Sequence, residues 1–247
     1  MWSPDQYEKF KAERQQPFHD LLSLVEKRPH MRLLDLGCGT GEPTRELHLT
    51  LEARETLGID NSETMLLKAG SFGGEMLHFQ KNSIEAFVTD DPYDLIFSNA
   101  ALHWVPDHER LLVRLTNFLS ADGQLALQMP ANDDHPSHVI AARLARDFGI
   151  EARPDFVLPP ERYAQLLHRL GYKRQHVRLQ VYGHLLPSTA DVVEWVRGAL
   201  LTHYEAALTK ERFAEYLQAY RERLIAELGE ERPFFYTYKR VLVWGTF

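Results

Sequence analysis

The segment from Met31 to Pro43 constrains the fold of this chain more than any other stretch. It starts with the apolar run MRLLDL at residues 31–36 and continues directly into GCGTG at residues 37–41. Glycines at this spacing allow the backbone to turn tightly. Pro43 suits the first turn of a helix, where its missing N–H costs nothing. The pattern therefore predicts a strand, a tight turn and a helix in immediate succession.

The same alternation continues along the chain up to Met129. Further strands are predicted at 56–59, 76–79, 93–98 and 123–129, each separated from the next by a helix or a turn. Strands that alternate with helices of about ten residues form parallel β-α-β units, which indicates an α/β fold with a doubly wound sheet.

The pattern changes on both sides of this region. Before it we expect a helix that Pro17 ends or kinks, followed by a short helix that buries Leu21, Leu22 and Val25. After it we expect helices at 138–148, 163–170, 188–203 and 209–228. Two late strands are expected at 172–182 and 234–247. The sequence thus predicts an N-terminal helical region at 1–30 and an α/β domain at 31–247. Its helical cap would come mainly from about 131–170 and 188–230.

Composition narrows the class of partner. The net charge of −7 argues against a dedicated nucleic-acid binder, because phosphate contacts need clustered lysine and arginine. Cys38 is the only cysteine, which suits a reducing compartment. With neither an apolar signal segment nor an apolar run long enough to span a membrane, we expect a cytoplasmic protein that acts on a small molecule. No obligate protein partner is evident.

The glycine turn also carries chemical information. A dinucleotide-binding turn would need a third glycine at position 42, where this chain has Glu42. Asp35 stands two residues before the first glycine, where it would repel a pyrophosphate but suits a cationic amino group. Asp60, at the end of the next predicted strand, can accept hydrogen bonds from both hydroxyls of a ribose.

Together these residues resemble the class I S-adenosylmethionine (SAM)-dependent methyltransferases. Residues 35–41 resemble the first motif of that family, Asp60 resembles its ribose-binding acid, and DLIFSNAALHWV at 94–105 resembles its fourth-strand motif. The resemblance implies a mostly parallel, seven-stranded, doubly wound sheet and SAM as the cofactor. It also places the first thirty residues as a lid.

The resemblance implies a set of cofactor-binding residues. Asn82 stands where the family usually has an acid, and its side-chain carbonyl can still accept from the adenine amino group. The full set is Tyr7, Arg14, Asp35, Gly37, Cys38, Gly39, Gly41, Asp60, Asn61, Asn82, Ser83, Ile84, Asn99, Ala100 and Trp104.

More narrowly, the chain resembles the trans-aconitate methyltransferase group. The shared elements are an N-terminal WSPxxYxxF run, QMP at 128–130, PSH at 136–138, LPS at 186–188 and EWV at 194–196. The arginine that the group carries shortly after EWV is missing from 198–204. The resemblance implies O-methylation of a carboxylate of a small organic acid, and no base is needed for such an acceptor.

Other acceptors stay open at this point. A hydroxyl, amine or activated-carbon acceptor would need a base, for which His103 is the candidate. A protein that binds SAM or a nucleotide without catalysis is the alternative from another class. No spacing of histidines and cysteines in the sequence indicates a metal site. Arg143 and His203 are possible cap groups for a polar substrate, and the candidate substrate contacts are Phe10, His103, Trp104, His138, Tyr163 and Arg197.

Overall fold

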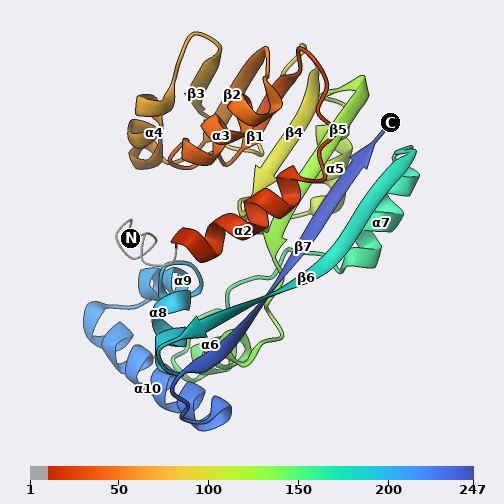
Figure 1. Ribbon diagram of the computed structural model, residues 1–247. Coiled ribbons are helices and arrows are strands. Elements are labelled where there is room, and N and C mark those ends of the chain that lie inside the picture. Colours follow the sequence, from red (N-terminus) through yellow and green to blue (C-terminus); the bar gives the residue numbers. More distant parts are fainter. Residues whose placement is uncertain (1–10) are drawn as a thin grey trace. The chain divides into compact units, whose positions relative to one another are not determined.

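The computed structural model describes the backbone of residues 11–247 and the side chains from residue 15 onward (Figure 1). Its helices and strands follow one another as α2 (Lys11–Leu22), β1 (Arg32–Leu36), α3 (Glu42–Leu51), β2 (Glu55–Asp60), α4 (Glu63–Ala69), η1 (Gly70–Phe72), β3 (Leu77–Lys81), β4 (Tyr93–Asn99), η2 (Leu102–Trp104), α5 (His108–Thr116), β5 (Leu119–Pro130), α6 (Pro136–Asp147), α7 (Pro160–Arg169), β6 (Arg174–Leu186), α8 (Asp191–Arg197), α9 (Leu200–Ala207), α10 (Lys210–Leu228) and β7 (Phe234–Thr246). Among these residues, no helix combines the length and the apolar character that crossing a membrane would require.

The strands form one seven-stranded sheet in the order β3-β2-β1-β4-β5-β7-β6. β1 pairs in parallel with β2 and β4, and the outer pairs β2–β3 and β4–β5 are parallel as well. β7 runs antiparallel to β5. This confirms the doubly wound, mostly parallel seven-stranded sheet. The order reverses between β1 and β4, and ligands of such sheets bind at the carboxyl ends of the strands where the order reverses.

The chain folds into two compact units. The first, here called the sheet unit, contains residues 16–130, 156–180 and 240–247. The second, here called the helical unit, contains residues 131–155 and 181–239 together with 11–15.

The core of the sheet unit forms because its strands are apolar on both faces. Phe18 and Leu21 of α2 and Leu47 of α3 pack against one face, which includes Leu33 and Phe97. The side chains that alternate with these, such as those of Leu34 and Ile96, are equally buried. Burial on both faces is typical of a parallel sheet covered by helices on each side.

The helical unit has its own core, which contains several tyrosines among aliphatic side chains. Tyr216 and Tyr220 of α10 are fully buried with Tyr236 of β7. The Tyr216 hydroxyl donates to the carbonyl of Ala141 at 2.8 Å, and the Tyr220 hydroxyl donates to the carbonyl of Ser137 at 2.9 Å. Both carbonyls belong to α6, so these bonds tie α10 to α6.

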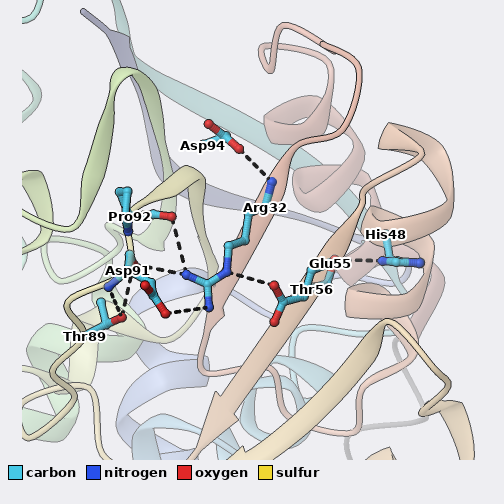
Figure 2. A network of polar contacts seen from close by, with 8 residues as sticks. All are labelled: Arg32, His48, Glu55, Thr56, Thr89, Asp91, Pro92 and Asp94. Atoms are coloured by element: carbon cyan, nitrogen blue, oxygen red, sulfur yellow. Dashed lines mark hydrogen bonds and ion pairs between the residues drawn. The ribbon is translucent and has the colours of Figure 1, made fainter.

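A polar network holds the amino-terminal edge of the sheet (Figure 2). Arg32, the first residue of β1, donates its Nε to Glu55 of β2 at 2.9 Å, and its backbone N–H donates to Asp94 of β4 at 2.8 Å. Its guanidinium also lies 4.4 Å from the ring centre of Tyr93. The glycine turn follows the other end of β1, so this network belongs to the scaffold.

Two sequence predictions about helices were wrong. α2 continues through Pro17 to Leu22, so the two expected N-terminal helices are one. A proline inside a helix costs about 3 kcal/mol, which the burial of Phe18 and Leu21 against the sheet offsets. The helix expected at 188–203 is two, α8 and α9. The chain leaves the helical conformation at Ala199 directly after Gly198, a poor helix former.

Candidate active site

The glycine turn joins β1 to α3 at the point where the strand order reverses. The backbone amides of Gly37 and Cys38 both donate to the carbonyl of Ile59, at 2.8 and 3.0 Å, which ties the turn to the end of β2. Gly37 has φ +75°, and a Cβ there would lie 2.2 Å from the Cβ of Ala101. A side chain at this position would therefore separate the turn from the segment that follows β4.

Gly39 differs from Gly37, because nothing lies within 4 Å of the point where its Cβ would be. Its φ is +55°, and its amide donates to Oδ2 of Asp60 at 2.9 Å. The backbone of the turn is therefore bare on this side. A ligand can approach it closely, as phosphate- and nucleoside-binding turns require.

Asp60 ends β2 and braces the turn. Besides the bond to Gly39, its Oδ1 accepts from the amide of Ser62 at 2.8 Å, and Ser62 in turn caps α4. A carboxylate has about four acceptor positions, two on each oxygen. One position on each oxygen therefore remains, which suits a pair of neighbouring hydroxyls.

Asp35 lies in a very different environment, in the middle of the sheet. Its carboxylate is 5% exposed and accepts from the Thr44 hydroxyl of α3 at 2.6 Å. Burial raises the pKa of Asp35, the Thr44 hydrogen bond opposes the rise and the charge of Asp60 adds to it, so that the pKa is about 7. A carboxyl group in this state would be stabilised as an anion by a nearby ligand cation.

Cys38 is a small side chain that fills the interior of the turn. It is buried, and burial together with Asp35 and Asp60 raises the pKa of the thiol far above its usual range. The thiol stays protonated and is a poor nucleophile.

The segment after β3 lies beside the turn. The amide of Asn82 donates to the carbonyl of Asp60 at 3.0 Å, and Ser83 Oγ accepts from the amide of Ala86 at 3.1 Å. Ile84 approaches within 3.9 Å of the position of a Gly37 Cβ. Residues 82–84 therefore lie beside the glycines, while Asn61 is exposed.

The segment after β4 closes the other side of the turn. Asn99 ends the strand, and its buried Oδ1 has no hydrogen-bond partner among the described residues. Ala100 has φ +54°, and its amide donates to the carbonyl of Gln128 at 2.9 Å. His103 is buried with its ring centre 4.7 Å from that of Trp104, which is itself 48% exposed. The unsatisfied carbonyl and the exposed indole both suit a site that a ligand completes.

The remaining predicted residues are not all brought to this place. Tyr7 and Phe10 lie outside the described residues, as does the side chain of Arg14. Tyr163 is fully buried in the sheet unit, and its hydroxyl bonds to His108 and to the amide of Leu158, which favours a structural role.

His138 and Arg197 belong to the helical unit. His138 lines a cavity there, whereas Arg197 lies on α8 with Glu194 at 4.0 Å. Sequence reasoning missed Thr44, because nothing in a sequence pairs a helix hydroxyl with a strand acid. It also missed Arg146 and Arg153, although Val139, Ala142, Arg143 and Arg146 have the spacing of one helix face.

Comparison with known proteins identifies the family of the chain. A model of a methyltransferase domain family matches residues 8–177. A trans-aconitate 2-methyltransferase of Deinococcus radiodurans is 40% identical, covering 99% of this chain and 98% of that protein. One of Streptomyces avermitilis is 37% identical over 94% and 93% of the two chains.

Solved structures share the fold. The YcgJ protein of a Bacillus has a TM-score of 0.64 at 17% identity, with 94% of this chain and 98% of that chain covered. A phosphoethanolamine N-methyltransferase 2 of Haemonchus contortus, solved in complex with S-adenosyl-L-methionine, has a TM-score of 0.57 at 14% identity, with 94% and 52% covered.

The matched family model and the curated relatives define an enzyme that transfers methyl groups. The chain belongs to the methyltransferase family, and S-adenosylmethionine is its methyl donor.

Proposed function

We propose that this enzyme methylates a carboxylate of a small organic polyacid, with trans-aconitate as the substrate to test first. The observation that carries the proposal is the 40% identity, over nearly the whole of both chains, to a protein named for that reaction. A further seven relatives bearing the same name are 34–37% identical. The match extends through the helical unit. A shared cofactor site in the sheet unit would not by itself require the helical units to be similar.

The residues around the glycine turn fit S-adenosylmethionine. The open face of Gly39 admits the ligand, the two remaining acceptor positions of Asp60 suit the ribose hydroxyls, and Asp35 favours a cationic amino group. Asn82 to Ile84 would border the adenine, and the unsatisfied Oδ1 of Asn99 would accept from a donor on the ligand.

The chemistry asks little of the protein beyond alignment. Bound S-adenosylmethionine supplies a methyl group activated by its sulfonium. A new C–O bond forms at the acceptor, the C–S bond breaks with its electron pair staying on sulfur, and no proton is transferred. The protein needs to hold the acceptor in line and exclude water. His103 is then a wall of the site together with Trp104, and it is not a required base.

Other parts of the chain would contribute recognition. We propose residues 1–30 as a lid. Of the expected cap at about 131–170 and 188–230, we assign selection of the acceptor to the helices of the helical unit, since α7 belongs to the sheet unit. A small-molecule acceptor and a cytoplasmic location fit the single cysteine and the net charge of −7.

A turnover screen tests the proposal. The protein is incubated with S-adenosylmethionine and a panel of di- and tricarboxylates, and esters are identified by mass spectrometry together with S-adenosylhomocysteine. We expect a monomethyl ester of trans-aconitate in a one-to-one ratio with S-adenosylhomocysteine. The Asp60→Ala variant, which loses the bond to Gly39 and the acceptor positions proposed for the ribose, should bind S-adenosylhomocysteine about tenfold or more weakly. Methylation of hydroxyl or amine acceptors without any ester would refute the carboxylate assignment.

A further inference from the structure

The helical unit contains a cavity of about 330 Å³. One face of α6, the chain around Arg153 and the side chains of Leu200 and Tyr204 of α9 line it. The volume is at the lower end of the range for small-molecule sites, about 300–1,000 Å³. The α6 face includes the small Ala142, which leaves room between its larger neighbours.

The cavity carries an excess of positive charge in a chain whose net charge is −7. Three arginines line it, Arg143, Arg146 and Arg153, against two aspartates, Asp133 and Asp155. Arg153 is already paired with Asp133 at 2.7 Å. Arg143 and Arg146 have no acidic partner among the described residues. Two guanidinium groups on one helix face are therefore available to an anion.

Neutral polar groups complete the lining. His138 is 7% exposed, and burial together with Arg153 lowers its pKa to about 3, so its ring stays neutral. The Tyr204 hydroxyl accepts from the amide of Arg153 at 3.3 Å, which leaves its own proton to donate. The site can thus offer both charged and neutral donors to a ligand with several oxygens.

We propose that this cavity is the recognition site for the acid substrate, and that Arg143 and Arg146 bind the carboxylates of a di- or tricarboxylate. The inference rests on the proposed function, since it assigns the place where that substrate is selected. Guanidinium groups bind carboxylates through paired hydrogen bonds, and these charge-assisted bonds are stronger than neutral ones. Arg153 is held by its ion pair with Asp133, and its backbone amide donates to the Tyr204 hydroxyl, which keeps that hydroxyl in place in the lining. The arginine missing from 198–204 is then replaced by arginines from α6.

Direct binding tests the site without relying on turnover. Isothermal titration calorimetry of trans-aconitate and citrate, without S-adenosylmethionine, is carried out on the wild-type protein and on three variants. Arg143→Gln/Arg146→Gln removes both charges, and Ala142→Leu fills the cavity while keeping them. Arg221→Gln, a control outside the cavity, removes one arginine charge at an exposed position of α10. Inorganic phosphate serves as the competing anion. Melting temperature and S-adenosylhomocysteine affinity verify that each variant is folded.

We expect the double arginine variant to bind the tricarboxylates at least about tenfold more weakly, since each charge-assisted bond is worth about a factor of ten. Ala142→Leu should also weaken binding, and Arg221→Gln should not. In turnover assays the loss should fall on KM more than on kcat, as expected for a binding contact.

The outcomes separate this inference from the proposed function. Unchanged tricarboxylate affinity in both the double variant and Ala142→Leu overturns the cavity assignment, and ester formation by the wild type then still supports the proposed function. Tighter binding of phosphate than of any carboxylate also overturns it. Arginine-dependent tricarboxylate binding without any ester product supports the cavity and refutes the proposed function.

Discussion

Two carboxylates on either side of one glycine turn have opposite environments. Asp60 bonds to two backbone amides, whereas Asp35 is buried with a single hydroxyl donor. The pKa of Asp35 is raised to about 7 from 3.8, so its ionised form destabilises the ligand-free fold. At about 1.4 kcal/mol per unit this amounts to something on the order of 4 kcal/mol. A ligand cation would recover part of that cost, which couples cofactor binding to the charge of Asp35.

Asp35 should make cofactor affinity depend on pH. The cation favours the carboxylate, so the affinity for S-adenosylhomocysteine should rise as pH increases towards 7 and flatten above it. Calorimetry between pH 5.5 and 8 measures this. Asp35→Asn should bind more weakly at pH 8, and its affinity should change little over this range. An equal pH dependence in both proteins would contradict the assignment.

The same group should affect stability with the opposite sign. Because the folded pKa lies above the unfolded value of 3.8, the native state binds more protons between about pH 4 and 7. The free energy of unfolding should therefore fall as pH rises through this window. Without ligand, Asp35→Asn should melt at a higher temperature than the wild type at pH 8, as thermal denaturation can show. A lower melting temperature at that pH would contradict the charge argument.

His103 should not be an essential base if the acceptor is a carboxylate. Loss of a general base usually costs about 10²–10⁴ in rate, whereas loss of a wall costs much less. We expect His103→Asn to lower kcat for trans-aconitate by less than about tenfold. Steady-state kinetics from pH 6.5 to 8.5 should show a nearly flat kcat for both proteins. A hundredfold loss of kcat in His103→Asn would instead support His103 as a general base.

The positions of single residues could be predicted from the sequence where a strand end or a tight turn requires a particular residue type. The glycines and Asp60 stand at the ends of strongly patterned strands, so their neighbourhood follows from the parallel sheet. Thr44 and Arg153 were not, because their partners Asp35 and Asp133 meet them only through folding. Tyr163 was predicted as a substrate contact and is instead buried with its hydroxyl hydrogen-bonded. The sequence cannot distinguish these two roles of a tyrosine hydroxyl.

At the scale of elements, the amino-terminal edge of the sheet carries stability and the carboxyl-terminal edge carries the site. Arg32 joins β1, β2 and β4 through Glu55 and Asp94 (Figure 2), and its side chain is only 17% exposed. The glycine turn follows the same strand, starting five residues after Arg32, yet shares none of these contacts. The two ends of β1 can therefore be perturbed separately.

Arg32→Leu should destabilise the protein without weakening the cofactor site. Removing the guanidinium leaves Glu55 without its partner, and we expect a loss of about 1–3 kcal/mol in the free energy of unfolding. Urea denaturation measures the loss, and the Kd for S-adenosylhomocysteine should stay within about twofold. Lys81→Gln, which breaks the exposed pair with Glu63, should cost less than about 1 kcal/mol. Equal losses in the two variants would contradict the role given to Arg32.

Elements with strong periodicity were predicted well. The five parallel strands follow from their apolar runs, and Ser62 and Pro43 mark helix starts where the structure has them. The errors came where tertiary packing overrides local preference. Burial of Phe18 and Leu21 keeps α2 continuous through Pro17, and no local rule anticipates that.

On the scale of the whole molecule, the two units have separate cores, and the proposed cofactor site and the proposed acid site belong to different units. Hydrogen exchange followed by mass spectrometry should resolve them. S-adenosylhomocysteine should slow exchange most at 37–41, 60–62 and 82–84, and citrate should slow it most at 138–146 and 200–204. Slowing by citrate that is confined to the sheet unit would contradict the cavity assignment. Slowing by S-adenosylhomocysteine that spares the glycine turn would contradict the cofactor site.

The antiparallel pairing of β7 with β5 has a consequence for synthesis on the ribosome. Gln124 pairs with Thr246 and Pro130 with Arg240, so the two partners are made far apart in time. Until residues 240–246 emerge, β5 is an open, apolar edge that can recruit other chains. Nascent chains stalled before Arg240 would therefore carry that unprotected edge, and they are the species most dependent on chaperones.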